Sequence, residues 1–267
     1  AYIGTGINSL SKLLKNETHF NNRVPSIFIP TTHGTGSEVT MWGTIWNMSE
    51  KKKYSISHPD LYPNVAILDG NLTLSLPLDI SISTILDAVS HSFEAIWNKN
   101  ANSTSTAYAI EAICLILTHV EKLKQSPHSI DLRNVLLKAS NIAGLAFSNT
   151  KTAAAHSISY PLTIRYGIPH GIACSLPLLS LLRINKDAIE KELNLIIKKL
   201  GMSSFSEINE YIKRVSGDML KFTLRDWGVK RSDFGNLIEN SFTNNRINNN
   251  IVDLTKYHVE LILNKIY

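Results

Sequence analysis

Four side chains in this sequence could bind one divalent metal ion, and they are Asp87, His91, His156 and His170. Asp87 and His91 are four residues apart in the stretch 80–94, whose pattern predicts a helix. Residues at positions i and i+4 lie one above the other on a helix, so this carboxylate and this imidazole can share one ion. His156 and His170 add two imidazoles. Such a mixture of nitrogen and oxygen ligands suits iron(II), zinc or a similar ion, and an open position beside it would let a substrate oxygen bind.

Each of these residues also has a simpler interpretation when it is taken alone. An aspartate and a histidine at helical spacing more often form a surface or capping pair. His156 stands in an alanine-rich stretch and could be a core histidine that is bonded to a carbonyl group. The neighbouring sequence therefore has to decide between the two interpretations.

The elements that would position these residues change in character near residue 78. Short apolar strands are predicted at 24–30, 39–47, 54–57 and 65–68, and helices at 80–94, 106–123, 129–147, 152–165, 171–182, 187–200, 204–214 and 252–265. We therefore expect an incomplete α/β domain over residues 1–78 and a complete all-helical domain over residues 79–267. The metal ligands would lie on at least two helices that face the cleft between the domains.

Composition restricts the class of protein. A hydrophobic content of 43% allows a packed core, and 18% charged residues argues against disorder. The net charge of +5 comes from scattered residues, which gives little support to nucleic-acid binding and weak support to small anionic ligands. Cys114 and Cys174 lack Cys-x-x-Cys spacing and are expected to be reduced core thiols, which favours a cytoplasmic location. No apolar run reaches the length of a membrane span.

The segment 30–40, Pro-Thr-Thr-His-Gly-Thr-Gly-Ser-Glu-Val-Thr, resembles a segment of the iron-containing (group III) alcohol dehydrogenases. Further blocks at 51–54, 63–69, 86–95, 168–173 and 244–250 follow in the order of that family and extend the resemblance over essentially the whole chain. The resemblance implies the dehydroquinate synthase-like architecture, in which a nucleotide-binding α/β domain, partial here, precedes an all-α metal-binding domain. It also implies a homodimer.

The same resemblance implies roles for individual residues. Asp87, His91, His156 and His170 would bind the metal, with Fe²⁺ expected first and Zn²⁺ as the alternative. The second cofactor would be NAD or NADP, and the reaction a reversible hydride transfer between it and a small aldehyde or primary alcohol. Cofactor contacts are expected from the residues Thr31, Thr32, Gly34, Gly36, Ser37 and Lys53. A structural turn and an ordinary solvated lysine are the alternatives for these residues.

Residues 156–163 and 165–171 are similar to phosphonoacetaldehyde reductases, which convert phosphonoacetaldehyde to 2-hydroxyethylphosphonate. Many family members carry a second histidine four residues after the third metal ligand, where this chain has Tyr160. The hydroxyl group of Tyr160 could relay a proton, or the ring could pack below His156. Arg165 is a candidate phosphonate anchor, because a guanidinium suits a tetrahedral dianion, and an exposed arginine at a helix end is the alternative.

Two other functions stay open. The chain could be a general alcohol or diol dehydrogenase of the same family, or a helical module that binds metal without catalysis. The family's Gly-Gly-Gly-Ser turn, which holds the cofactor pyrophosphate, is absent from this sequence. The first residues predict a helix that contains Ile7, Leu10, Leu13 and Leu14. We therefore expect a fragment of a longer protein rather than a natural short form.

Overall fold

The structure is a computed structural model that describes residues 24–47, 49–50, 52–242 and 246–267. The predicted N-terminal helix, Lys51 and the start of the asparagine-rich segment 244–250 lie outside the described residues. None of the described helices is both long and apolar enough to cross a membrane.

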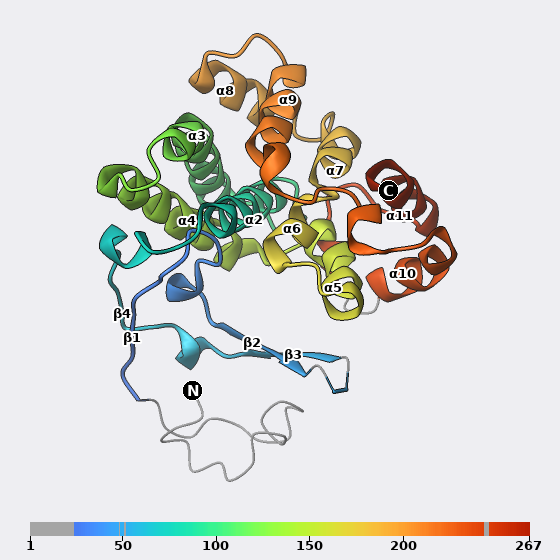
Figure 1. The fold of residues 1–267 in the computed structure, drawn as a ribbon, viewed down its shortest axis with the longest axis horizontal. Helices are drawn as coiled ribbons and strands as arrows, with labels where there is room; N and C mark the ends of the chain where they lie inside the picture. Colours follow the sequence, from blue (N-terminus) through green and yellow to red (C-terminus); the bar gives the residue numbers. More distant parts are fainter. Residues whose placement is uncertain (1–23, 48, 51, 243–245) are drawn as a thin grey trace.

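The described strands form two small sheets before residue 67 (Figure 1). β1 (Ile27–Phe28) pairs with β4 (Val65–Ala66) in parallel, with Ile27 opposite Val65. β2 (Trp42–Asn47) and β3 (Lys52–Ser57) form an antiparallel hairpin. The 3₁₀ helices η1 (Ser37–Val39) and η2 (Pro59–Leu61) lie between these strands, and η3 (Gly70–Thr73) follows β4. The parallel pair exposes apolar side chains to solvent, because 61% of the surface of Ile27 is accessible.

From residue 78 onward the described chain is helical. The α-helices are α2 (Leu78–Ile96), α3 (Ser103–Gln125), α4 (Ile130–Thr150), α5 (Ala154–Tyr166), α6 (His170–Ser175), α7 (Leu178–Asn185), α8 (Glu190–Leu200), α9 (Phe205–Ser216), α10 (Phe234–Ser241) and α11 (Lys256–Ile266). Between them lie the 3₁₀ helices η4 (Gly217–Met219), η5 (Arg225–Trp227), η6 (Arg231–Asp233) and η7 (Arg246–Asn249). The predicted fold class, a partial α/β part followed by an all-helical part, is confirmed.

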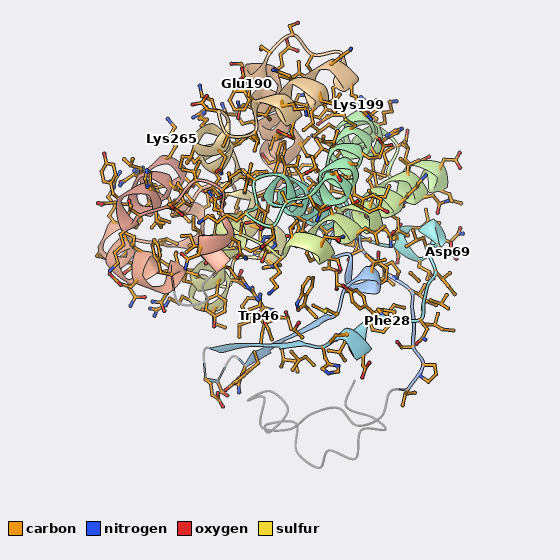
Figure 2. The ribbon with its side chains drawn as sticks, turned by 180° about the vertical axis from the view of Figure 1, so that it is seen from behind. Phe28, Trp46, Asp69, Glu190, Lys199 and Lys265 are labelled. Atoms are coloured by element: carbon orange, nitrogen blue, oxygen red, sulfur yellow. The ribbon has the colours of Figure 1, made fainter. Side chains whose placement is uncertain are left out.

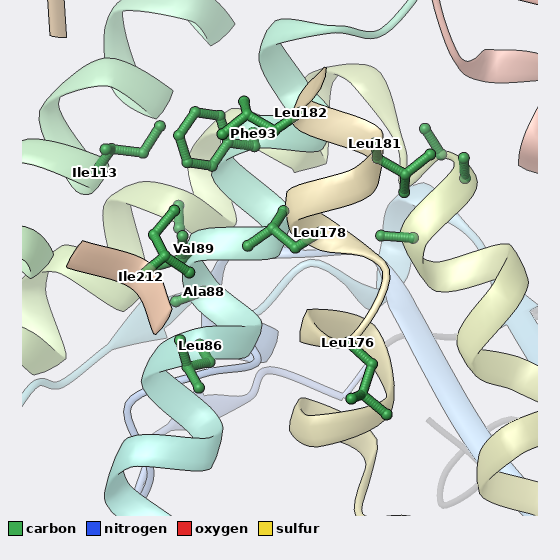
Figure 3. Packing of buried hydrophobic residues seen from close by; sticks show 14 of the residues in the cluster. Leu86, Ala88, Val89, Phe93, Ile113, Leu176, Leu178, Leu181, Leu182 and Ile212 are labelled. Atoms are coloured by element: carbon green, nitrogen blue, oxygen red, sulfur yellow. The ribbon is translucent and has the colours of Figure 1, made fainter. Parts of the chain in front are cut away.

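Helix α2 runs through the centre of the helical part and is buried along nearly its whole length. Its apolar side chains, among them Val89 and Phe93, pack among residues of α3, α7 and α9 (Figure 3). A helix that is surrounded on all sides cannot shift without disturbing its neighbours, because protein interiors are close-packed. Polar side chains on α2 are therefore held in fixed positions.

The predicted helix at 171–182 is wrong as a single element. The chain forms α6 up to Ser175 and restarts as α7 at Leu178, after Pro177. Proline has no N–H to donate and its ring clashes with the preceding turn, so it interrupts a helix. Helix α10 was not predicted from the sequence, and it is only eight residues long.

Glycines hold the loop before β2 against the helices. Gly36 has a φ of +54°, and a Cβ atom there would lie 2.5 Å from Cα of Gly144 on α4. A Cβ atom on Gly34 would lie 2.8 Å from the carbonyl oxygen of Thr84 on α2. Both positions require glycine because backbone approaches backbone. The loop is thereby fixed beside the helix that carries Asp87.

Candidate metal centre and cofactor pocket

Helix α2 presents three ionisable side chains on one face. Asp87 and His91 are one turn apart, and Glu94 follows after a further turn. All three are buried, with 3%, 5% and 0% of their surfaces exposed respectively. Burial of so many ionisable groups is costly unless each has a partner.

His156 on α5 connects two of these carboxylates. Its Nε2 atom lies 3.4 Å from Oδ1 of Asp87. Its Nδ1 atom lies 2.6 Å from Oε2 of Glu94, and its backbone N–H donates to Oε1 of the same carboxylate at 3.1 Å. Glu94 thereby fixes the orientation of the imidazole ring. This is the arrangement in which a second carboxylate supports a metal-binding histidine.

His170 begins α6 and completes a compact group. Asp87, His156, His170 and Cys174 each offer one ligand atom, and these atoms all lie within 4.8 Å of one another. The thiol of Cys174 donates to Oγ of Ser159 at 3.2 Å, and its sulfur lies 3.6 Å from Nε2 of His170.

His91 lies beside this group without belonging to it. Its ring stacks on His156 with centroids 4.4 Å apart, and on Phe147 of α4 with centroids 4.1 Å apart. Its Nδ1 atom is buried and has no hydrogen-bond partner among the described residues. The structure therefore brings three of the four predicted ligands together, and it places the fourth against them.

The donor atoms fit a divalent cation. Oδ1 of Asp87 and Nε2 of His156 are buried, close together and without hydrogen bonds in the described part of the chain. Buried polar atoms are otherwise almost always hydrogen-bonded. One carboxylate oxygen and several imidazole nitrogens form the mixed ligand set that iron(II) or zinc accepts. A cation at this position would give the orphaned atoms a common partner.

The protonation states of Asp87, His91 and His170 suit metal binding, whereas that of His156 opposes it. Burial lowers the pKa of His91 and of His170 to about 4. Burial alone would raise the pKa of Asp87, but its histidine neighbours hold it below the usual value. Burial disfavours the charged form of His156, but Cys174 and the two carboxylates beside the ring raise its pKa. A cation that binds the ring would therefore compete with a proton.

A cavity of about 770 Å³ opens beside these residues. The hairpin forms one wall, because alternate residues of a strand point to the same face. Three cross-strand pairs line the cavity, namely Trp42 with Ser57, Thr44 with Ser55, and Trp46 with Lys53. Figure 2 shows Trp46 on this hairpin, beside the helical part. Trp46 also meets His170 edge-on, with ring centroids 6.0 Å apart.

The predicted cofactor residues differ in their positions. Ser37 and Lys53 line the cavity. Gly34 and Gly36 are buried beneath it against α2 and α4, as described above. Thr31 is exposed and Thr32 is half-buried, and neither lines the cavity. The structure thus gives the glycines a packing role, and it leaves their predicted contact with cofactor untested.

Neither of the two predicted substrate residues lines the cavity. The hydroxyl group of Tyr160 accepts a hydrogen bond from the backbone N–H of Lys53 at 2.8 Å, and its ring stacks on Trp46 with centroids 5.9 Å apart. Tyr160 therefore holds the hairpin against α5. Arg165 is exposed in the last turn of α5 and does not line the cavity. The structure does not bring Arg165 to the position that a phosphonate anchor would need.

Comparison with known proteins identifies the family. Residues 81–267 match the C-terminal domain of the Fe-containing alcohol dehydrogenase family, and residues 2–70 match the iron-containing alcohol dehydrogenases. The chain belongs to the iron-containing alcohol dehydrogenases. The recognition that was based on the sequence motifs is confirmed.

Individual members of the family are similar over different lengths. A phosphonoacetaldehyde reductase from Streptomyces viridochromogenes is 33% identical over 159 residues, which are 60% of this chain and 40% of that protein. A 1,3-propanediol dehydrogenase from Citrobacter freundii is 32% identical over 248 residues, which are 87% of this chain and 64% of that protein. The chain thus spans less than two thirds of these relatives.

Among solved structures, a sulfoacetaldehyde reductase from Bifidobacterium kashiwanohense in complex with NAD⁺ is 31% identical, with a TM-score of 0.85. The similarity covers 94% of this chain and 68% of that chain. A 1,3-propanediol oxidoreductase has the same TM-score at 28% identity. The helical arrangement around α2 is thus shared with known members of the family.

Sequence reasoning assigned no role to three residues of the site. Glu94 is seven residues after Asp87, so helical spacing alone could have placed both carboxylates on one face. Cys174 is four residues after His170 and could have been found by the same rule. Arg246 lines the cavity as the first residue of η7, within the asparagine-rich segment 244–250. No local pattern indicates its contact with the hairpin, because the two segments meet only in the folded chain.

Proposed function

We propose that this chain contains the metal centre and part of the nicotinamide site of an oxidoreductase that interconverts a small aldehyde and the corresponding primary alcohol. The observation that carries the proposal is the Glu94–His156–Asp87 arrangement, in which one buried carboxylate orients an imidazole whose other nitrogen points to a second carboxylate. Buried perturbed groups beside a large cavity are typical of active sites.

The proposed function requires a metal ion and a nicotinamide cofactor. Asp87, His91, His156 and His170 would hold the cation, with iron(II) as the first candidate and zinc as the second. When bound, the cation would supply Lewis-acid polarisation of the substrate oxygen, and a nicotinamide cofactor would exchange the hydride. Family membership supports both groups, and the relative from Bifidobacterium kashiwanohense was solved with NAD⁺.

The protein's own contribution is orientation and exclusion of water. Glu94 accepts a hydrogen bond from Nδ1–H of His156, so Nε2 is the ring nitrogen that would lose its proton and bind the cation. The stacked rings of Phe147, His91 and His156 restrict rotation of the imidazoles. Trp42 and Trp46 cover the site from the side of the hairpin. Electrostatic effects on the substrate are larger in a cavity that is shielded from water than in water itself.

The substrate proposed first is phosphonoacetaldehyde, which would be reduced to 2-hydroxyethylphosphonate. Support comes from the resemblance at residues 156–171 and from the 33% identity with a phosphonoacetaldehyde reductase. The 1,3-propanediol dehydrogenase that matches 87% of the chain supports a general alcohol or diol dehydrogenase as the alternative.

The test uses the full-length protein, purified without oxygen and loaded with iron(II) or zinc. Consumption of NADH and of NADPH is followed with phosphonoacetaldehyde, propanal and 3-hydroxypropanal. We expect metal-dependent reduction of at least one aldehyde and its loss in Asp87→Ala and His156→Ala. Metal-loaded, folded protein that reduces no aldehyde with either cofactor would contradict the proposal. Preference for 3-hydroxypropanal over phosphonoacetaldehyde would favour the diol dehydrogenase.

A further inference from the structure

Three cationic side chains line the cavity, namely Lys53, Lys151 and Arg246, and none of them has an ion-pair partner in the described part of the chain. Lys53 and Arg246 are the two that contact residues of the hairpin wall. Lys53 places its ammonium group 5.0 Å from the centroid of the Trp46 ring. Arg246 donates one hydrogen bond, from Nη2 to Oγ of Ser55 at 3.4 Å. Asp87 is the carboxylate residue among the cavity-lining side chains, and its Oδ1 atom faces His156. The charge of Asp87 reaches Lys53, but one carboxylate does not balance the charges of both Lys53 and Arg246.

The two cations lie on the same side of the cavity. Lys53 and Ser55 alternate on β3 and therefore point to the same face of the hairpin. Arg246 reaches that face through Ser55. Burial and then the charge of Arg246 lower the pKa of Lys53 to about 8, although Cys174 and Asp87 raise it. Two like charges that are held together away from water destabilise the folded chain unless an anion joins them.

The pair also lies within electrostatic reach of the candidate metal ligands. Lys53 contributes to the lowered pKa of His170, in which burial is the largest cause. The charge of Arg246 interacts with Glu94 and Cys174. An anionic group bound by these cations would lie in the same cavity as Asp87 and His156.

We propose that Lys53 and Arg246 form an anion-recognition site that selects short aldehydes with a tetrahedral oxyanion, a phosphonate or a sulfonate, at the end opposite the carbonyl group. The proposal rests on the proposed function, since it assumes that the carbonyl group lies toward Asp87 and the histidines. A guanidinium fork pairs with two oxygens of such an anion, and an ammonium group can meet the third. Arg246 thus takes the role that the sequence had suggested for Arg165.

The test compares substrates that differ in charge. Arg246→Met and Lys53→Met keep the length of each side chain and remove its charge. We expect kcat/KM for phosphonoacetaldehyde to fall about 30- to 100-fold in Arg246→Met, which corresponds to the loss of charge-assisted hydrogen bonds. With propanal we expect a change of at most about threefold, because the same hydrogen bonds are not made. Arg246→Lys should restore part of the loss.

Two arginines serve as controls. Arg183→Met removes an exposed arginine of α7, and it should leave both substrates unaffected. Arg165→Met tests the earlier candidate directly. A selective loss with phosphonoacetaldehyde in Arg165→Met, together with none in Arg246→Met, would overturn the assignment.

The cations could instead serve a phosphate group of the cofactor. Titration of NADH and NADPH by fluorescence separates the two sources of anion. Weaker cofactor binding in Arg246→Met, with equal losses for phosphonoacetaldehyde and propanal, would overturn the proposal. Weaker binding of methylphosphonate, measured by calorimetry in the presence of saturating cofactor, would support it.

Methylphosphonate binding also keeps the two proposals apart. If the wild-type protein reduces no aldehyde, the proposed function fails, and calorimetry still shows whether Arg246 binds a tetrahedral oxyanion. If the wild-type protein reduces propanal and phosphonoacetaldehyde equally well and methylphosphonate does not bind, the anion site alone is refuted.

Discussion

Replacement of Glu94 by glutamine should weaken metal binding although Glu94 would not touch the metal. The carboxylate accepts two hydrogen bonds from His156, one from Nδ1 at 2.6 Å and one from the backbone N–H at 3.1 Å. A glutamine amide has one oxygen and an NH₂ group, so it can accept only one of them and would turn a donor toward the other. The variant also removes the negative charge that polarises the ring.

The magnitude follows from these two bonds. Loss of one buried hydrogen bond to a charged group costs about 1.5–3 kcal/mol. Every 1.4 kcal/mol is a factor of about ten in affinity, so the metal should bind about 10- to 100-fold more weakly, the range known for residues behind a metal ligand. Competition between the protein and a chromophoric chelator for zinc measures this affinity without reference to activity.

A matched control is Glu38→Gln. Glu38 is also buried, and it accepts a hydrogen bond from Asn141 at 2.9 Å, away from the histidines. Its replacement should leave zinc affinity within about twofold, because no ligand depends on it for orientation. Equal zinc affinity in wild type and in Glu94→Gln would refute the reasoning that Glu94 orients His156.

Three further predictions concern stability, the hairpin and pH. Arg133→Met should lower the free energy of unfolding, measured by urea titration, by about 3 kcal/mol. The buried guanidinium donates to the carbonyl oxygens of Pro127, Thr73 and Leu76, which would lose their donors. An unchanged urea midpoint would contradict this. Tyr160→Phe should speed amide exchange at Lys53 about fivefold, the equivalent of about 1 kcal/mol, and equal exchange would mean that the hydroxyl group does not hold the hairpin. The ratio of kcat/KM for phosphonoacetaldehyde to that for propanal should fall as pH rises through about 8. Burial and Arg246 lower the pKa of Lys53 to about 8 although Cys174 and Asp87 raise it, and the ammonium group attracts an anion only below that pKa. A ratio that does not change with pH would exclude Lys53 from anion recognition.

The fold could be predicted from the sequence where patterns are local and long. The helix predicted over residues 80–94 is present as α2. The break at Pro177 was missed because the apolar pattern continues on both sides of it. Hydrophobic periodicity indicates which residues are buried. It does not indicate where a proline, which lacks a backbone N–H, ends a helix.

The site could be predicted only in part, for a similar reason. Spacing within one helix links Asp87 to His91, and family motifs added His156 and His170, whose binding of a metal stays a prediction. The roles of Arg246 and Tyr160 depend on contacts across the fold, where Arg246 meets Ser55 and Tyr160 meets Lys53. Arg165 was considered as a phosphonate anchor because it is near His170 in sequence, with an exposed arginine at a helix end as the alternative, and in the structure it is exposed.

Whether one cation joins Asp87 to the histidines is tested most directly by crystals of the metal-loaded full-length protein, measured at the absorption edge of iron or zinc. The account predicts one strong anomalous peak, at about 2.0–2.2 Å from Oδ1 of Asp87 and from Nε2 of His156. The same peak should be absent from crystals of Asp87→Ala. No peak at this position at saturating metal, or a peak that is bound by other residues and unchanged in the variant, would contradict the account.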